Sequence, residues 1–230
     1  MGMSMGWEDR AESWLAWART PGHDSYWLFR EAFFELVPEP DGTALEVGCG
    51  EGRVCRDLRS RGWDAVGLDA SETLRTAAAE ADPDGTYVLG TAEALPFPEE
   101  SFALVVAYNS LMDVDDMPRT VSEIARVLRA GGRFAACVTH PFRDVGSFEA
   151  DEDGEVFVVR RPYLEEGVFE GTFTRNGLTM RFDGRTHPVE SYARALEDAG
   201  FLIEALREPV GFDARDRRMP QFLLLRAVKP

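Results

Sequence analysis

The chain has 230 residues, of which 44% are hydrophobic and 29% are charged. This is the composition of a folded protein that is long enough to bury a core without disulfides or metals, and it excludes wholesale disorder. With 25 Lys and Arg against 41 Asp and Glu, the formal net charge is −16, which disfavours nucleic acid and anionic membranes as main partners.

The cysteines and the hydrophobic segments indicate where the protein is found. The three cysteines form no C-x-x-C pair, which is typical of reduced thiols and predicts a cytoplasmic location. Residues 1–17 carry acids and tryptophans, so we expect no signal peptide, and no apolar run reaches the ~18 residues of a membrane span. The three histidines are scattered, so we expect no metal site. The sequence does not indicate an oligomeric state.

Aromatic residues crowd the N-terminal part of the chain, and their spacing is helical. Tyr26, Phe33 and Val37 fall near one face of a helix that Pro38 would end. We expect residues 1–40 to form a helical lid that excludes water from a site in the domain behind it.

From residue 41 onward the hydrophobic pattern alternates between strands and helices. One of the helices is expected to begin after Ser71, which would cap it. The run Phe102–Ala107 is almost continuously apolar, which is typical of a parallel strand buried on both faces. This alternation predicts right-handed βαβ units with helices on both faces of a parallel sheet. The strands predicted within residues 41–140 are 44–47, 65–68, 86–89, 102–107 and 133–138.

The pattern changes after residue 140, and residues 141–187 are expected to form a β-rich cap. The Asn-Gly dipeptide at 176–177 is typical of a two-residue hairpin turn, because both residues tolerate positive φ. Such a turn would place Phe173 opposite Met180. The acidic run at 149–155 is expected to be a solvated loop.

The alternating pattern resumes in residues 188–230, which are expected to complete the core. A helix begins near Pro188, and strands follow at 201–206 and 222–228. No helical period separates these two strands, so we expect them to be antiparallel. The predicted fold is α/β and Rossmann-like: a doubly wound, mostly parallel seven-stranded sheet with an antiparallel last strand. The N-terminal helical lid precedes the sheet, and the β-hairpin cap is inserted after the fifth strand.

A glycine-rich turn follows the first predicted strand. The segment Leu45–Arg53 places its glycines as G-x-G-x-G, whereas a dinucleotide fingerprint is G-x-G-x-x-G, and no G-K-[ST] of a P-loop occurs. Asp69 ends the second predicted strand, where a carboxylate can accept hydrogen bonds from both hydroxyls of a ribose. These residues predict an adenosine-bearing ligand without a long phosphate chain.

With these motifs the chain resembles the class I S-adenosylmethionine-dependent methyltransferases. Among them it most resembles the small-molecule enzymes related to ubiquinone and menaquinone biosynthesis. The resemblance implies their Rossmann-like fold and S-adenosylmethionine as the cofactor. The segments that carry it, in the family's order, are Leu45–Arg53, Asp69, Gly90–Phe97, Phe102–Asn109 and Val127–Arg133.

The resemblance also implies which residues hold the cofactor. The glycines would pass under the methionine and ribose portions, Asp69 would bind the ribose, and Asn109 would border the sulfonium. Thr91 stands where many relatives have Asp, which puts one contact to the adenine in doubt. The expected cofactor-binding residues are Tyr26, Glu46, Gly48, Cys49, Gly50, Gly52, Asp69, Ala70, Thr91, Ala92, Glu93, Asn109 and Met112.

Methyl transfer needs alignment and exclusion of water, and it needs a base only when the acceptor must lose a proton. His140 follows the fifth predicted strand, and His187 lies where the cap meets the next helix. We expect these two as candidate catalytic residues. The alternative for His140 is a capping role at a strand end, and for His187 a loop role. His23, before Tyr26, is a weaker candidate.

The predicted function is methyl transfer from S-adenosylmethionine to an oxygen or nitrogen of a small-molecule metabolite. The partner would be that acceptor, with no nucleic acid and no membrane. The first alternative is a non-catalytic module that binds S-adenosylmethionine for regulation. The second is a nicotinamide-dependent oxidoreductase, against which the glycine spacing argues.

Overall fold

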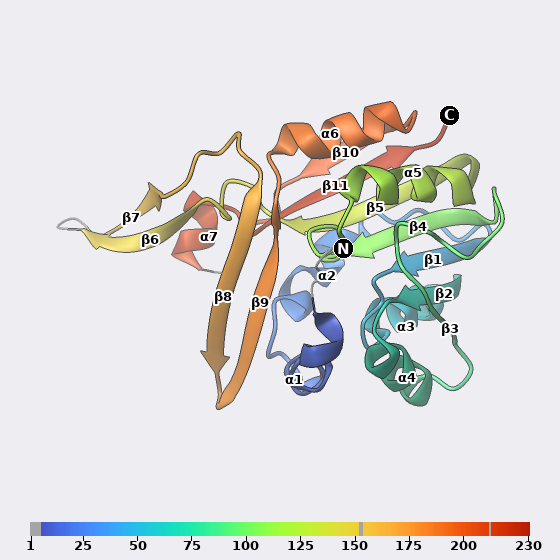
Figure 1. The fold of residues 1–230 in the computed structure, drawn as a ribbon, viewed down its shortest axis with the longest axis horizontal. Coiled ribbons are helices and arrows are strands. Elements are labelled where there is room, and N and C mark those ends of the chain that lie inside the picture. Colours follow the sequence, from blue (N-terminus) through green and yellow to red (C-terminus); the bar gives the residue numbers. More distant parts are fainter. Residues whose placement is uncertain (1–5, 152–153, 212) are drawn as a thin grey trace.

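The computed structural model describes residues 6–151, 154–211 and 213–230, and a seven-stranded sheet forms its centre (Figure 1). The strand order is β10-β11-β5-β4-β1-β2-β3. Strand β11 is antiparallel to both of its neighbours, and the pairs among β1 to β5 are parallel, which confirms the predicted fold class. The bounds are β1 (Thr43–Val47), β2 (Asp64–Asp69), β3 (Thr86–Leu89), β4 (Phe102–Tyr108), β5 (Leu128–Thr139), β10 (Leu202–Arg207) and β11 (Phe222–Val228).

Helices cover both faces of this sheet (Figure 1). The helices α5 (Met117–Val127) and α6 (Val189–Asp198) pack on one face, and α3 (Arg53–Ser60) packs on the other. Helix α4 (Glu72–Ala81) lies against β2 and β3, and Ser71 caps it by accepting a hydrogen bond from the Leu74 N–H, as predicted. Because both faces are covered, every residue of β4 is buried, which explains its continuous apolar run.

Two helices precede the sheet. Helix α2 (Tyr26–Phe34) buries its aromatic face in the same core as α3. Helix α1 (Trp7–Arg19) lies farther out, between α4 and the strand β9 (Leu178–Thr186) (Figure 1). The first helix therefore bridges the sheet domain and the part of the chain inserted after β5.

The insertion contains two hairpins. Strands β8 (Gly167–Arg175) and β9 pair around Asn176 and Gly177, whose φ angles are 50° and 79°. The predicted pairing of Phe173 with Met180 is confirmed. This long hairpin extends from the sheet down past α1 (Figure 1).

The second hairpin corrects the sequence analysis. Residues 149–155 were expected in a solvated loop, but the described residues of that run belong to β6 (Gly146–Asp151) and β7 (Gly154–Val159). Phe148 lies directly opposite Phe157, and their rings meet edge to face with centroids 5.2 Å apart. An aromatic cross-strand pair of this kind stabilises a hairpin, which the acidic composition had hidden.

A short helix, α7 (Ala214–Arg218), lies between β10 and β11, where no helix was expected. Asp213 caps it by accepting a hydrogen bond from the Arg215 N–H at 2.8 Å. One turn and a half is too short for a crossover, so β10 and β11 are still antiparallel, as predicted. Within the described ranges, none of the helices combines the length and hydropathy that crossing a membrane requires.

Candidate active site

A large cavity lies at the carboxyl ends of the central strands. Its volume is about 1550 Å³, which exceeds the roughly 300–1,000 Å³ of an ordinary ligand pocket and leaves room for two small molecules. The strand ends of the sheet form its floor, and α1, the segment between α1 and α2, and the hairpin β8–β9 form its other walls. Ligands of doubly wound sheets bind at this edge.

The glycine-rich turn after β1 forms one part of the floor. Gly48 has a φ of 73°, and a Cβ at this position would lie 2.5 Å from the Cβ of Ser110. The N–H groups of Gly48 and Cys49 donate to the Leu68 carbonyl at 2.8 and 2.9 Å, which ties the turn to β2. Gly48, Cys49 and Gly50 line the cavity with bare backbone that a ligand can approach closely.

Gly52 lies behind this turn, outside the cavity wall. It precedes α3 with a φ of 82°, and a Cβ there would lie 2.8 Å from the Tyr87 hydroxyl oxygen. Gly52 therefore allows α3 to begin close to β3.

Asp69 joins the ends of β1 and β2. Its Oδ2 accepts a hydrogen bond from the Gly50 N–H at 2.7 Å, and its Oδ1 accepts one from the Ser71 N–H at 2.9 Å. Burial raises the pKa of this carboxyl, and the backbone hydrogen bonds oppose the shift. Each carboxylate oxygen has a further lone pair, so Asp69 can still accept hydrogen bonds from a ligand. Asp69 and Ala70 both line the cavity.

Glu46 also lines the cavity, from within β1. It is 2% exposed, and its Oε2 accepts a hydrogen bond from the Cys55 N–H at 2.8 Å in the first turn of α3. Burial raises the pKa of Glu46 to about 8. The side chain therefore holds the start of α3 against the glycine-rich turn.

The segment after β3 forms the next part of the wall, through Thr91, Ala92 and Glu93. The Glu93 carboxylate accepts a hydrogen bond from the Asp115 N–H at 2.8 Å. This bond connects the segment to the loop between β4 and α5. Glu93 thus joins two segments of the cavity wall.

Asn109 and Met112 follow β4 and line the cavity. Asn109 has a φ of 54°, its N–H donates to the Cys137 carbonyl at 2.8 Å, and its Oδ1 accepts from the Cys137 thiol at 3.3 Å. Leu111 points away into the core. The Met112 carbonyl accepts from the Arg185 N–H at 2.7 Å, so the hairpin β8–β9 is anchored beside this loop.

Tyr26 lies outside the cavity wall. It is 1% exposed, and its hydroxyl donates to Asp57 Oδ2 at 2.5 Å. Its ring packs edge to face on Tyr108 with centroids 5.2 Å apart. Burial, with the nearby Asp57 carboxylate as the second cause, raises the pKa of Tyr26. The aromatic helix α2 therefore presents this tyrosine to the core.

Neither His140 nor His187 lies in the wall of the large cavity. The His140 Nδ1 accepts a hydrogen bond from the Phe142 N–H at 3.2 Å, so the proton is on Nε2, which lies 2.8 Å from Glu208 Oε1. His187 lines a separate pocket of about 140 Å³, where its Nδ1 lies 2.9 Å from Glu166 Oε1. Both histidines thus have carboxylate partners away from the large cavity.

An aromatic wall that the sequence did not identify stands opposite the strand ends. A Cβ at Gly50 would lie 3.2 Å from Trp14 Nε1, so α1 covers the glycine-rich turn. Trp14 and Trp17 pack edge to face on Phe182 of β9, with centroids 6.2 and 5.8 Å apart. The aromatic composition of residues 7–37 was visible, but helical spacing alone did not show which rings face a hairpin more than 150 positions away.

His23 was a weaker candidate, and it does line the cavity. Its ring packs edge to face on Trp17 with centroids 4.3 Å apart. Neither ring nitrogen has a hydrogen-bond partner within the described ranges, and both nitrogens are covered by neighbouring atoms. The ring therefore acts as part of the aromatic wall in this conformation.

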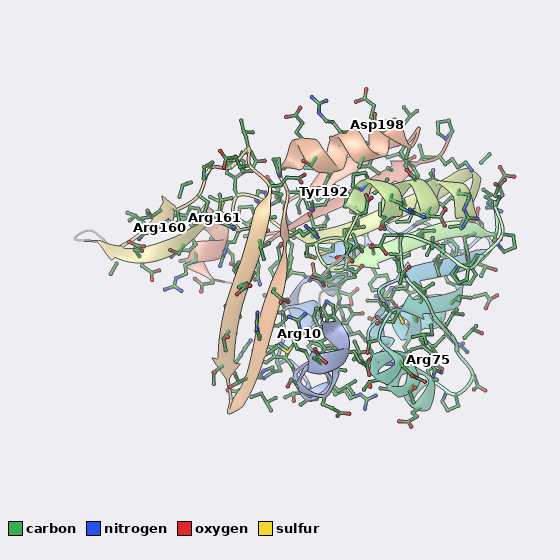
Figure 2. All side chains as sticks on the ribbon, in the orientation of Figure 1. Arg10, Arg75, Arg160, Arg161, Tyr192 and Asp198 are labelled. Atoms are coloured by element: carbon green, nitrogen blue, oxygen red, sulfur yellow. The ribbon has the colours of Figure 1, made fainter. Side chains whose placement is uncertain are left out.

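Asp113, in the loop after β4, also lines the cavity. Burial raises its pKa well above the usual range, and the nearby Arg10 guanidinium opposes the shift. Arg10 forms an ion pair with Asp183 of β9. Figure 2 shows Arg10 on the part of α1 beside the long hairpin. Asp113 and this ion pair bring the loop after β4, α1 and β9 together at one side of the cavity.

The charge of the wall is unbalanced. Eleven carboxyl side chains and four arginines line the cavity. Such a wall favours a cationic ligand and repels an anionic pyrophosphate. Among the residues that the structure describes, no group of histidine, cysteine and acidic side chains has the arrangement of a metal site.

Comparison with known proteins agrees with this geometry. Residues 45–136 match the methyltransferase domain family. An uncharacterised methyltransferase of Mycobacterium bovis is 35% identical over 103 residues, which are 45% of this chain and 42% of that protein. A demethylmenaquinone methyltransferase of Beutenbergia cavernae is 33% identical over 112 residues, or 49% of this chain and 46% of that protein. The chain thus spans less than half the length of these curated relatives.

The similarity of the fold extends farther along the chain. The crystal structure of an S-adenosylmethionine-dependent methyltransferase from Mesorhizobium loti superimposes with a TM-score of 0.71 at 27% identity, covering 89% of this chain and 98% of that one. The predicted resemblance is confirmed: residues 45–136 match the methyltransferase domain family, and the chain has the fold of the class I S-adenosylmethionine-dependent methyltransferases.

Proposed function

We propose that this protein transfers the methyl group of S-adenosylmethionine to an oxygen or nitrogen atom of a small-molecule acceptor. The observation that carries the proposal is the convergence of the glycine-rich turn, Asp69 and the segment Thr91–Glu93 on one cavity. Each had been assigned to the cofactor separately, from its motif. Their common wall supports one bound molecule with adenine, ribose and amino-acid portions.

The residues present fit this cofactor. The missing Cβ atoms of Gly48 and Gly50 leave a cradle of bare backbone, and Trp14 covers it from the other side. S-adenosylmethionine supplies a methyl group on a sulfonium cation, and the acidic wall stabilises a positive charge. In this proposal Asp69 holds the ribose hydroxyls, Ala92 and Glu93 border the adenine, and Asn109 and Met112 border the sulfonium.

The protein's contribution to the reaction is alignment and exclusion of water. In-line displacement requires the acceptor atom, the methyl carbon and the sulfur to be collinear, and a fixed site removes much of the entropic barrier. The aromatic wall of Trp14, Trp17 and Phe182 excludes water from the middle of the cavity. The same cavity would take an acceptor with an apolar body, since Phe169 and Phe173 of β8 line it.

The same geometry weighs against the nicotinamide alternative. A dinucleotide carries an anionic pyrophosphate, which the excess of carboxyl groups in this wall would repel. The regulatory alternative, a module that binds the cofactor without turnover, differs from the proposal only in catalysis. The volume of the cavity favours a second ligand beside the cofactor, and hence an acceptor.

Two measurements test the proposal. Thermal unfolding is followed with S-adenosylhomocysteine, S-adenosylmethionine and NADH in parallel. A ligand at about 100 times its Kd stabilises by about 2.7 kcal/mol, which raises the Tm of a chain of this size by roughly 5–11 °C. We expect this rise with the two adenosyl sulfur ligands and no rise with NADH. A rise with NADH alone would contradict the proposal.

Transfer of a labelled methyl group to a panel of small phenols and amines then separates an enzyme from a regulatory module. We expect label in at least one product, with formation of one S-adenosylhomocysteine per methyl group transferred. Tight binding of the cofactor without any transfer across a broad panel would favour the regulatory module.

A further inference from the structure

We propose that Asp144 is the catalytic base of this site, and that the methyl acceptor therefore carries a proton on its nucleophilic oxygen or nitrogen. The inference rests on the methyltransferase function proposed above and adds to it a catalytic residue and a substrate class. It replaces His140 and His187 as candidates for the base, because both lie outside the large cavity.

Asp144 lies in the loop after β5, beyond the carboxyl end of the sheet, and it lines the cavity. Its Oδ2 accepts a hydrogen bond from the Thr139 hydroxyl at 2.7 Å, which orients the carboxylate. Within the described ranges no hydrogen bond reaches its Oδ1. One carboxylate oxygen is thus held in place, and the other is free to face a ligand.

The strand geometry brings this carboxylate close to the expected position of the sulfonium. The Cys137 thiol donates to the Asn109 side chain at 3.3 Å, and Asn109 borders the sulfonium in the proposed function. Thr139 is two residues beyond Cys137 in β5, so it lies on the same face of the strand, about 6.5 Å farther along. Asp144 is hydrogen-bonded to Thr139, so its carboxylate lies near the end of β5, in the cavity that Asn109 also lines.

The two arginines near Asp144 donate their hydrogen bonds to other groups and not to its carboxylate. Arg143 donates to Asp216 and to the Met219 carbonyl, and Arg161 donates to the backbone carbonyls of Asp144 and Val168. Figure 2 shows Arg161 at the base of the two hairpins. Burial raises the pKa of Asp144 to about 6, and the Thr139 hydrogen bond and both guanidinium groups oppose this shift.

One further group faces Asp144 from α6. The Tyr192 phenol is buried, and burial followed by the charge of Asp144 raises its pKa. Tyr192 therefore stays neutral while Asp144 titrates near pH 6. A carboxylate with a pKa near the working pH is suited to accept a proton during the reaction.

The proposed reaction transfers one methyl group to the acceptor and one proton from the acceptor to Asp144. A lone pair of the acceptor oxygen or nitrogen forms the new bond to the methyl carbon. The bond from that carbon to sulfur breaks with its electron pair remaining on sulfur, and the acceptor proton passes to Asp144 Oδ1. Since Phe169, Phe173 and Phe222 also line this cavity, an acceptor with an apolar, ring-bearing body would suit it.

The experiment uses the whole chain saturated with S-adenosylhomocysteine and three probes with one skeleton: 2-naphthol, 2-naphthylamine and 2-methoxynaphthalene. The first two carry a proton on oxygen or nitrogen, and the third does not. Binding at pH 7.5 is measured by calorimetry. We expect the wild type to bind the naphthol, the naphthylamine or both about tenfold more tightly than the ether, because a hydrogen bond to a carboxylate is stronger than a neutral one. The preference between the first two identifies the acceptor atom.

Asp144→Ala is expected to abolish the preference without changing the affinity for S-adenosylhomocysteine. Glu165→Ala is the matched control, because it removes an exposed carboxylate from the same insertion, outside the cavity wall. The preference of the wild type should also decline as the pH falls through about 6, while that of Asp144→Ala stays absent at every pH.

Three results would overturn the inference: equal binding of all three probes, a preference that survives in Asp144→Ala, or no binding of any probe to the complex. Failure of S-adenosylhomocysteine to bind the wild type is a different result, which would overturn the proposed function itself. Retained binding of S-adenosylhomocysteine in Asp144→Ala shows that this variant is folded.

Discussion

The backbone N–H of Gly50 donates a hydrogen bond to Asp69 Oδ2 at 2.7 Å. Two motifs assigned to the cofactor from separate strands are therefore one structural unit, since the carboxylate that would bind ribose also holds the glycine-rich turn. The second oxygen of Asp69 accepts from the Ser71 N–H, and Ser71 caps α4. A change at Asp69 is thus expected to affect both ligand binding and the turn.

Asp69→Ala should weaken the binding of S-adenosylhomocysteine by about 1–3 kcal/mol, because charge-assisted hydrogen bonds to ribose and the support of the turn are both lost. Calorimetric titration measures the change. Asp64→Ala is the control, since Asp64 is the exposed first residue of the same strand. Equal affinities for Asp69→Ala and the wild type would remove Asp69 from the binding site.

Gly48→Ala tests how tightly the glycine-rich turn packs against Ser110 in the loop after β4. Its Cβ would lie 2.5 Å from the Ser110 Cβ, whereas a Cβ at Gly131 would have no atom within 4 Å. Both glycines have nearly the same positive φ, 73° and 74°, so Gly131→Ala measures the backbone strain alone, about 1–2 kcal/mol. We expect Gly48→Ala to lose a further ~1–3 kcal/mol of unfolding free energy in urea. Equal losses of unfolding free energy in the two variants would show that the loop after β4 moves aside without a measurable loss of stability.

Tyr26→Phe separates the lid helix from the cofactor site. Removal of the hydroxyl that donates to Asp57 should lower the free energy of unfolding by about 1–2 kcal/mol. The affinity for S-adenosylhomocysteine should stay within about twofold of the wild type, or within ~0.4 kcal/mol, because Tyr26 lies outside the cavity wall. A large loss of affinity at unchanged stability would return Tyr26 to the cofactor site.

Glu46 predicts a pH dependence of stability. Its pKa is raised from 4.5 to about 8 in the folded state, so the folded protein binds more protons than the unfolded chain between these values. The contribution of Glu46 is fully present below about pH 4.5 and is lost as the pH rises toward 8. Urea unfolding of Glu46→Gln across this pH range should show a smaller decline in unfolding free energy than the wild type. The difference should be a few kcal/mol at most.

Glu123 is the control of opposite sign. Its hydrogen bonds to Arg126 lower its pKa, so its contribution is present above about pH 4.5 and is lost as the pH falls below that value. Glu123→Gln should therefore leave the decline between pH 4.5 and 8 unchanged. If Glu46→Gln also leaves it unchanged, another group is responsible for the decline.

Local patterns were enough to predict most of the elements. Strand β4 is buried on both faces, and such a strand has a continuous apolar run. The Asn-Gly turn required positive φ at two positions, so it determined the register of β8 and β9. The hairpin β6–β7 was missed because acidic neighbours concealed the aromatic cross-strand pair of Phe148 and Phe157.

The two parts of the cavity differ in how far the sequence could predict them. The cofactor side is built from the residues that end adjacent parallel strands, so motif and strand order together brought Gly48, Asp69 and Asn109 to one edge. The proposed acceptor side is lined by side chains from α1, the loop after β5 and the hairpin β8–β9, which have no common sequence period. His140 and Asp144 are four residues apart, and only the fold turns one toward Glu208 and the other toward the cavity.

The sequence by itself therefore determined the sheet, its order of strands and helices, and the class of ligand that its glycine-rich edge suits. These follow from periodicity and backbone conformation, which act over a few residues. The tertiary structure alone decided that Tyr26 enters the core, that α1 lies against β9, and that Asp113 and Asp144 face the cavity. Those outcomes depend on packing between segments far apart in the chain, and such packing leaves no local pattern in the sequence.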